Sequence, residues 1–170
     1  MLNEQAVLEV LEKVRHRYYG KYRGSVTDVD EATMRIKAAV PAVLGDLSTG
    51  WAMPCVPYAG PNVGIAFLPE VGSGVWIEFE GGDPSLPVWT GGYWRDGEYP
   101  SDVKAKVKVI VTASENKIVL DDDAGQIVIS DNNGNKITLD SSGVQIERGG
   151  KKVLVSASEV NVNDGALEVL

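Results

Sequence analysis

The C-terminal part of this chain repeats one short pattern of apolar and turn-forming residues. In the stretch IVLDDDAGQIVISDNNGNKITLDSSG, residues 118–143, glycines stand at positions 125, 134 and 143, nine residues apart. Before each glycine lies a pair of apolar residues spaced i, i+2, which places both side chains on the same face of a β-strand. The residues between the pairs are mostly Asp, Asn, Ser, Gly and Lys, which favour turns or solvent. The pattern predicts short strands, apolar on one face, separated by turns.

The pattern continues to the end of the chain and predicts eight strand-sized segments. The first contains Val107, Val109 and Val111, which are also spaced i, i+2. The later pairs are Ile118/Leu120, Ile127/Ile129, Ile137/Leu139, Val144/Ile146, Val153/Val155, Val160/Val162 and Leu167/Val169.

Such strands are difficult to cover within one chain, because each offers only two or three apolar side chains to an inner face. A single-chain parallel β-helix needs about three strands per coil, so eight strands would leave both edges open after fewer than three coils. Three identical chains, each stepping from one face of a triangular prism to the next, would bring the pairs together on one axis. Burial there contributes about 1.5–3 kcal/mol for each Val, Ile or Leu.

We therefore expect a homotrimer with a C-terminal intertwined triple-stranded β-helix. The expected trimer core consists of Ile118, Leu120, Ile127, Ile129, Ile137, Leu139, Val144, Ile146, Val153, Val155, Val160 and Val162.

A nine-residue period also occurs in calcium-binding β-helices, but these need the pattern Gly-Gly-x-Gly-x-Asp. The segments DDDAG, DNNG and DSSG lack the paired glycines, and DNNGN lacks the closing Glu of an EF-hand loop. The sequence favours a solvated turn at Asp121–Asp123 over a calcium site, and we expect no metal site.

Residues 20–95 consist of short apolar stretches divided by Gly, Pro and Asp, as in a small closed β-barrel. In VWIEFE, the residues Val75, Ile77 and Phe79 alternate with polar or amphipathic ones, so one face of this strand is expected to be buried. About five strands in this length fit an OB-type barrel.

Residues 3–19 have apolar side chains at helical spacing. The predicted organisation is an N-terminal helix over 1–19, an OB-fold barrel over 20–95, a linker over 96–102 and the trimeric β-helix over 103–170. The expected fold class is mainly β.

Candidate catalytic groups are few. His16 is the only histidine, so no Ser-His-Asp set is available. Glu78 and Glu80 fall on one strand face about 7 Å apart, close to a glycosidase separation, but solvated acids on a barrel strand are the commoner arrangement. Cys55 is the only cysteine, which excludes an internal disulfide framework, and we expect it to be a small apolar filler. We expect neither an enzyme nor a cofactor.

The charge balance argues against a nucleic-acid partner. The net charge is −8 and the isoelectric point about 4.7, which disfavours contact with a phosphate backbone. Four tryptophans could form a stacking platform for bases or sugars, but we expect them to pack in the core and at interfaces. They are Trp51, Trp76, Trp89 and Trp94.

The N-terminal stretch MLNEQAVLEVLEKVRHRYYG contains acids throughout and no long apolar run, unlike a signal peptide. No stretch reaches the roughly 18 apolar residues of a membrane span. We expect the chain to be made in the cytoplasm without a signal peptide; if it acts outside the cell, something other than a standard secretion signal takes it there.

Residues 35–94 resemble the OB domain of central-spike proteins. This family includes the phage baseplate assembly protein V, the VgrG proteins of type VI secretion and their equivalents in extracellular contractile injection systems. The resemblance is carried by GWAMPCVPYAG, LPEVGSGVWIEFEGGDP and PVWTGGYW. In this family a β-repeat follows the OB domain and forms a trimeric needle, which agrees with the pattern above.

The resemblance implies a structural central spike of a contractile tail or injection apparatus. Such a spike is mounted on a hub protein at the end of the tube and punctures the target envelope, with transient membrane contact, when the sheath contracts. A PAAR-type tip protein often sits on the needle, and the edge formed by Leu167, Val169 and Leu170 would suit its docking. The basic cluster near the N-terminus is the expected hub-docking surface, and comprises Lys13, Arg15, Arg17, Lys21 and Arg23.

The chain departs from some family members. The linker 96–102 has no room for a lysozyme domain, and no His-x-His metal site is present near the C-terminus. Two alternatives stay open: an OB-fold module that binds oligosaccharide or single-stranded nucleic acid and is trimerised by a β-helical stalk, and an enzyme that uses Glu78 and Glu80.

Overall fold

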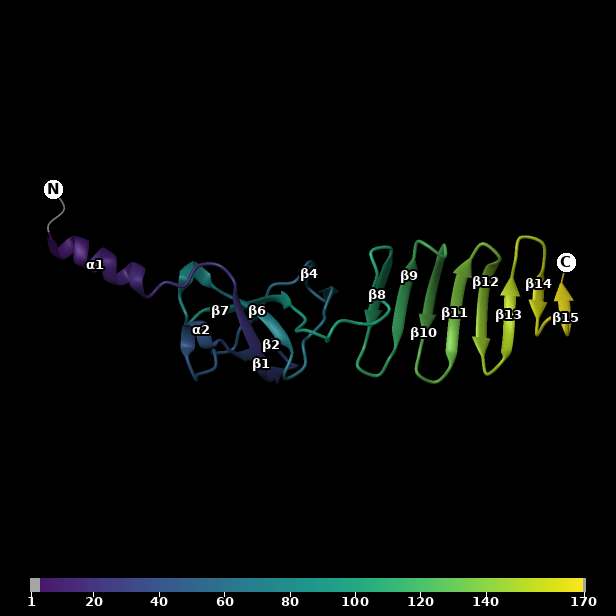
Figure 1. Cartoon of the computed structure of the whole chain (residues 1–170), viewed down its shortest axis with the longest axis horizontal. Coiled ribbons are helices and arrows are strands. Elements are labelled where there is room, and N and C mark those ends of the chain that lie inside the picture. The colour runs from purple at the N-terminus through teal and green to yellow at the C-terminus, as the bar shows by residue number, and fades with distance from the viewer. Residues whose placement is uncertain (1–3, 170) are drawn as a thin grey trace. The chain divides into compact units, whose positions relative to one another are not determined.

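The computed structural model describes residues 4–169. The chain divides into two compact units, Met1–Gly97 and Glu98–Leu170 (Figure 1). Most regular structure in both units is β-strand, which confirms the mainly β class. Among the described residues, helix is limited to α1 (Glu4–Arg15), α2 (Pro41–Leu44) and the 3-10 turn η1 (Glu80–Gly82).

Helix α1 ends at Arg15, earlier than residue 19, where apolar spacing predicted its end. The chain leaves the helix where Tyr18 joins the β-sheet unit. The Tyr18 amide donates to the Gly82 carbonyl at 2.8 Å, and its ring centroid lies 6.2 Å from that of Phe79. The apolar residues of α1 remain exposed, namely Val7, Leu8, Val10, Leu11 and Val14.

The first unit is built on a five-stranded sheet with the order β2-β1-β6-β7-β3. Its strands are β1 (Tyr22–Asp30), β2 (Arg35–Ala39), β3 (Met53–Pro54), β6 (Gly74–Phe79) and β7 (Pro87–Gly92). The β3–β7 pair is parallel and the other pairs are antiparallel. A small hairpin of β4 (Ala59–Gly60) and β5 (Val63–Gly64) projects from the long connection between β3 and β6. The sheet curls on itself, as in an OB-type barrel (Figure 1).

The core of this unit is built mainly from residues of the five-stranded sheet. In β6, Val75 and Ile77 are fully buried and Phe79 is nearly so, which confirms the predicted alternation. They pack with buried residues from β1, β2, β7 and the connection between β2 and β3, namely Val26, Ile36, Ala38, Val40, Ala52 and Trp89. Glu80 does not continue β6, because η1 begins at this residue.

The second unit is a single eight-stranded antiparallel sheet in which every strand pairs with its neighbours in sequence. All eight segments predicted from the repeat form strands. They are β8 (Val107–Val111), β9 (Lys117–Asp121), β10 (Gln126–Ser130), β11 (Asn135–Asp140), β12 (Gly143–Arg148), β13 (Lys151–Val155), β14 (Val160–Val162) and β15 (Leu167–Val169).

The nine-residue period corresponds to one strand plus one turn of this meander. Aspartates at strand ends accept turn hydrogen bonds: Asp121 from the amides of residues 123 and 124, Asp131 from those of 133 and 135, and Asp140 from that of 142. Gly134 has φ of +81°, a region that residues with a Cβ rarely adopt. At Gly143 a Cβ would lie 2.1 Å from the Val155 carbonyl oxygen, so only glycine fits without a backbone shift.

The meander differs from the expected stepping of each chain from one face of a prism to the next. The connections are tight: residues 141–142 join β11 to β12, and 149–150 join β12 to β13. Such short turns return the backbone to the strand just completed, so the ladder hydrogen bonds close within one chain.

Candidate functional site

One face of the C-terminal sheet carries a continuous stripe of apolar side chains. Directly opposed residues on neighbouring antiparallel strands point to the same face. One row runs Ile118, Ile129, Ile137, Ile146, Val153, Val162 and Leu167. The second row runs Leu120, Ile127, Leu139, Val144, Val155, Val160 and Val169. All twelve residues expected to form the trimer core therefore lie on one face, in register.

The stripe is left largely uncovered by its own chain. Ile137 is 36% exposed and Ile146 is 57% exposed, and most other members fall between these values. Large contiguous apolar surface of this kind marks an interaction site, because its exposure to water is unfavourable. The stripe is therefore the strongest candidate functional surface among the described residues.

The first strand joins the stripe through a residue that the sequence pattern missed. Ile110 lies opposite Ile118, and Lys108 lies opposite Leu120. Val107, Val109 and Val111 consequently share the opposite face with Val119, which corrects their alignment with the apolar pairs. Strand β8 has apolar residues on both of its faces, so the spacing of these residues alone could not show which face joins the stripe.

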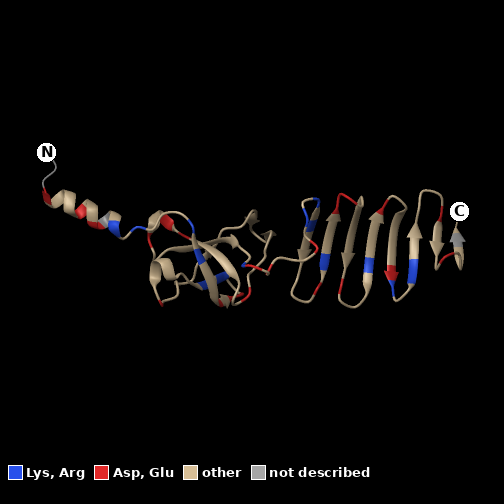
Figure 2. Ribbon diagram, viewed as in Figure 1, with Lys and Arg blue, Asp and Glu red and all other residues tan. Residues whose placement is uncertain are grey.

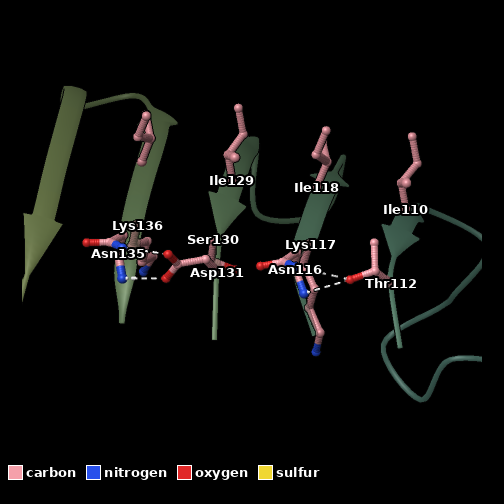
Figure 3. Close-up of a pocket in the computed structure, with 11 residues that line it drawn as sticks. Ile110, Thr112, Asn116, Lys117, Ile118, Ile129, Ser130, Asp131, Asn135 and Lys136 are labelled. Carbon is pink, nitrogen blue, oxygen red and sulfur yellow. Dashed lines mark hydrogen bonds between the residues drawn. The ribbon is translucent and has the colours of Figure 1, made fainter. Parts of the chain in front are cut away.

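The groove along the N-terminal part of the stripe has an apolar floor and a polar margin. Figure 3 shows Ile110, Ile118 and Ile129 projecting to one side of their strands. At the margin the Asn116 side chain donates to the Thr112 hydroxyl, 3.3 Å away. The Asn135 side chain donates to the Asp131 carboxylate at 2.5 Å. Each of these pairs ties the two ends of one turn together beside the apolar floor.

Asp131 has the most perturbed acidity of these turn residues. Its carboxylate accepts hydrogen bonds from the side chain and backbone of Asn135 and from Asn133. These bonds, that of the Asn135 side chain first, stabilise the charged form and lower the pKa of Asp131 to about 2. The carboxylate therefore stays ionised, and the turn intact, over a wide pH range.

The opposite face of the sheet is more polar. Its central row holds Val109, Val119, Val128, Thr138, Gln145, Leu154 and Asn161. Beside this row, Lys136, Glu147 and Lys152 alternate in charge on adjacent strands. Polar and charged groups suit a face that meets solvent, so the two faces of the sheet differ clearly in chemistry.

The expected hub-docking residues do not gather into one basic patch. Arg17 pairs with Asp83 at 3.1 Å. Lys21 pairs with Glu78 at 2.7 Å. Arg23 lies over the Trp76 ring, 5.8 Å from its centroid. These three side chains are engaged within the first unit.

The two remaining members of the basic cluster lie on α1. Arg15 is exposed at the end of the helix. The side chain of Lys13 lies outside the described structure.

The expected tip-docking residues lie on the last strand. Leu167 and Val169 are exposed and belong to the apolar stripe. Strand β15 pairs only with β14 and thus forms an edge of the sheet. Leu170 lies outside the described residues.

The candidate catalytic pair is not carried by one strand, contrary to the prediction from the sequence pattern. Glu78 is held by Lys21, and Glu80 belongs to the 3-10 turn that follows the strand. Within residues 4–169 no group of three or more His, Cys, Asp or Glu side chains could hold a metal ion. The filler role expected for Cys55 is wrong, because this residue is exposed where the chain leaves β3.

The tryptophans are separated rather than assembled into one stacking platform. Trp89 is buried in the core, as expected. Trp76 packs against Tyr93, with ring centroids 5.2 Å apart. Trp51 lies under the Lys37 ammonium, 4.5 Å from the ring centroid, and Trp94 is exposed.

None of the described helices combines the length and the apolar character needed to cross a membrane.

Two family models match the chain, one to each unit. Residues 22–94 match the type VI secretion system/phage-baseplate injector OB domain. Residues 107–168 match the phage baseplate V C-terminal trimerisation domain. Together the matches cover most of the chain, and both families are structural domains. Comparison with curated proteins gives no match. The second match supports a homotrimer and falls on the strands that carry the apolar stripe.

Proposed function

Since the chain belongs to the phage-baseplate and type VI secretion spike proteins, with their OB and trimerisation domains in order, we propose that three copies form a central spike that punctures a target envelope. In this proposal the spike is mounted on the hub of a contractile tail or injection apparatus. The observation that carries it is the apolar stripe, continuous over all eight strands and exposed in the single chain.

The proposed needle places three copies of the C-terminal sheet around one axis, with the stripes facing inward. Each copy supplies one face as a continuous antiparallel ribbon, because its ladder hydrogen bonds already close within the chain. Three such faces form a three-sided β-helical prism whose interior is apolar. Eight strands at about 4.8 Å spacing give a ribbon close to 35 Å tall.

This arrangement buries side chains that otherwise face water. About fourteen stripe residues, each roughly half exposed, would gain on the order of 10–20 kcal/mol per chain on burial, before the entropy of association. A spike that penetrates an envelope needs a shared apolar core of this kind, because a force applied to one strand is then distributed over all three chains.

We further propose two docking regions. The exposed apolar face of α1, with Arg15 at its end, contacts the hub, since three other members of the predicted cluster are engaged within the first unit. The edge strand β15 receives a PAAR-type tip protein through Leu167 and Val169. Both partners come from the family resemblance.

The trimer is tested by the mass of the full chain in solution. Sedimentation equilibrium or light scattering should give three times the chain mass of 18.2 kDa at micromolar concentration. A folded monomer at that concentration would refute the proposal. The puncturing role is tested by reconstituting particles with and without the spike and comparing envelope permeabilisation after sheath contraction.

A further inference from the structure

The two long edges of the C-terminal sheet, where the turns lie, differ in charge: one gathers five cations among acids, and the other is mainly acidic. The strands run alternately in opposite directions, so every second turn lies at the same edge. One edge, the cationic edge, holds Lys117, Lys136, Arg148, Lys151 and Lys152, together with the acids Glu115, Asp131, Glu147 and Asp164. The other, the acidic edge, holds Asp121, Asp122, Asp123, Asp140 and Glu159. In Figure 2 most blue bands of β9–β13 lie near one end of the strands, with a red band on β12 among them, and red turns lie at the other end.

Part of the cationic edge is neutralised within the chain. Lys117 pairs with Asp102 at 2.9 Å, and Lys152 pairs with Asp164 at 2.6 Å. Lys136 stands directly opposite Glu147 on the neighbouring strand, which is a favourable cross-strand combination.

Arg148 and Lys151 are different, because they stand directly opposite each other across the β12–β13 turn. The two glycines of this turn, Gly149 and Gly150, both have positive φ, which brings the strand ends close together. Like charges directly opposed in a sheet are destabilising, and neither cation makes an ion pair with another described residue. An anionic partner outside the chain would relieve this repulsion.

Both cations lie at the margin of the apolar stripe. Arg148 is two residues from Ile146 on β12, and Lys151 is two residues from Val153 on β13. Both cations therefore point to the same face of the sheet as the stripe. A hollow beside the stripe is lined by these two cations together with Ile137, Ile146 and Val153. A partner that covers the stripe thus also covers this pair.

The acidic edge offers carboxylates at the matching height. Asp140 stands at the β11–β12 turn and is held ionised by the hydroxyl and amide of Ser142, which lower its pKa. Glu159 stands at the β13–β14 turn. Rotation about a three-fold axis leaves height unchanged, so the β12–β13 turn of one copy lies level with the space between these two turns of the next. Each carboxylate is then about one strand spacing away, roughly 4.8 Å along the axis.

We propose that Arg148 and Lys151 of each copy pair with Asp140 and Glu159 of the adjacent copy. This inference rests on the proposed trimer and names the contacts that close it. A cyclic trimer joins two different edges of neighbouring copies, so the opposite charges of these four residues favour closure in one direction. A sheet offset along the axis or turned end for end loses this match. The occupant of the hollow is therefore a second copy of this chain.

The test uses charge reversal with a matched rescue in the full-length protein. Arg148→Glu with Lys151→Glu keeps a like-charged pair within the chain but places it against the acidic edge of the next copy. Asp140→Asn with Glu159→Gln removes that acidic edge, and the Asn side chain still offers the oxygen that accepts the turn hydrogen bonds. The temperature at which the trimer dissociates in SDS is measured for the wild type, both double variants and the combined variant.

We expect the reversed pair to lower this temperature by at least about 5 °C and the combined variant to recover at least half of the loss. Recovery also shows that the reversed chain still folds. A reversed variant as stable as the wild type, or a loss that the combined variant does not reduce, would overturn the inference.

If inorganic phosphate raises the wild-type dissociation temperature while the carboxylate variants have no effect, the pair binds a free anion rather than a second copy. A wild type that is not trimeric refutes the proposed function itself, which keeps the two failures distinct.

Discussion

Replacement of Ile127 by Asp gives the sharpest test of the inward-facing stripe. Ile127 lies between Leu120 and Leu139 in the second row and is 39% exposed in the single chain. A carboxylate here is tolerable for an isolated sheet, which leaves the side chain partly in water. In the proposed trimer, three carboxylates would face one axis in an apolar layer.

The free-energy cost of assembling the Ile127→Asp trimer depends on whether the three carboxyl groups stay ionised or take up protons. If all three stay ionised about 6 Å apart, each pair repels by about 3 kcal/mol at an effective dielectric constant near 20. Protonation at pH 7 instead costs about 4 kcal/mol for each carboxyl group with an ordinary pKa near 3.9. Loss of three buried isoleucines adds about 1.5–3 kcal/mol each. Whether the carboxyl groups stay ionised or become protonated, the summed free-energy cost is on the order of 10 kcal/mol per trimer. This cost is enough to prevent assembly at micromolar concentration.

The measurement is trimer content by sedimentation velocity between pH 7 and pH 3.5. We expect Ile127→Asp to be non-trimeric at pH 7 and to regain trimer as the carboxyl groups protonate. Ile127→Asn has nearly the same shape without the charge, and should show no such recovery. Ser130→Asp places the same carboxylate on the same strand but on the other face, opposite Lys117 and Lys136, and should assemble normally. An Ile127→Asp trimer at pH 7 with wild-type stability would refute the reasoning.

Four further results are expected. Ile77→Ala, at a fully buried position of the first unit, should destabilise that unit by about 2–5 kcal/mol in urea unfolding, and an unchanged midpoint would argue against the described core. Gly143→Ala should disrupt the β12–β13 register, because its Cβ would meet the Val155 carbonyl oxygen at 2.1 Å; loss of amide protection in hydrogen exchange at these strands checks this. Asp131 has a pKa lowered to about 2, so its stabilising effect is complete above the unfolded value near 3.9 and lost as pH falls through about 2. Asp131→Ala should accordingly lower the melting temperature at pH 7 but not near pH 2, and an equal effect at both would contradict the hydrogen-bond account. Deletion of residues 1–15 should spare the trimer but weaken co-purification with the hub protein, and unchanged recovery of the hub would count against docking through α1.

Much of the local structure was accessible from the residue pattern. The i, i+2 pairs located all eight C-terminal strands and the face to which β9–β15 direct their apolar side chains, because the two-residue period of a strand is a local property. The same alternation identified Val75, Ile77 and Phe79 as core residues. The end of α1 was misplaced, because the contact of Tyr18 with Gly82 is a tertiary interaction that competes with further helix.

Cross-strand contacts required the tertiary structure. Strand β8 is apolar at both parities, so only its pairing with β9 assigned Ile110, rather than Val109, to the stripe. Arg17, Lys21 and Arg23 formed a basic cluster in sequence, yet their partners Asp83, Glu78 and Trp76 lie more than fifty residues away along the chain.

The sequence by itself determined that the C-terminal segments are one-sided strands too apolar on that side to remain uncovered. The tertiary structure decided that these strands form one in-chain meander, that the stripe runs unbroken across it, and that Arg148 faces Lys151 across a glycine turn. The physical reason is that the face to which a side chain points follows from its position along its own strand, which is a local property. The residues beside it, in contrast, follow from which backbone groups pair across the sheet.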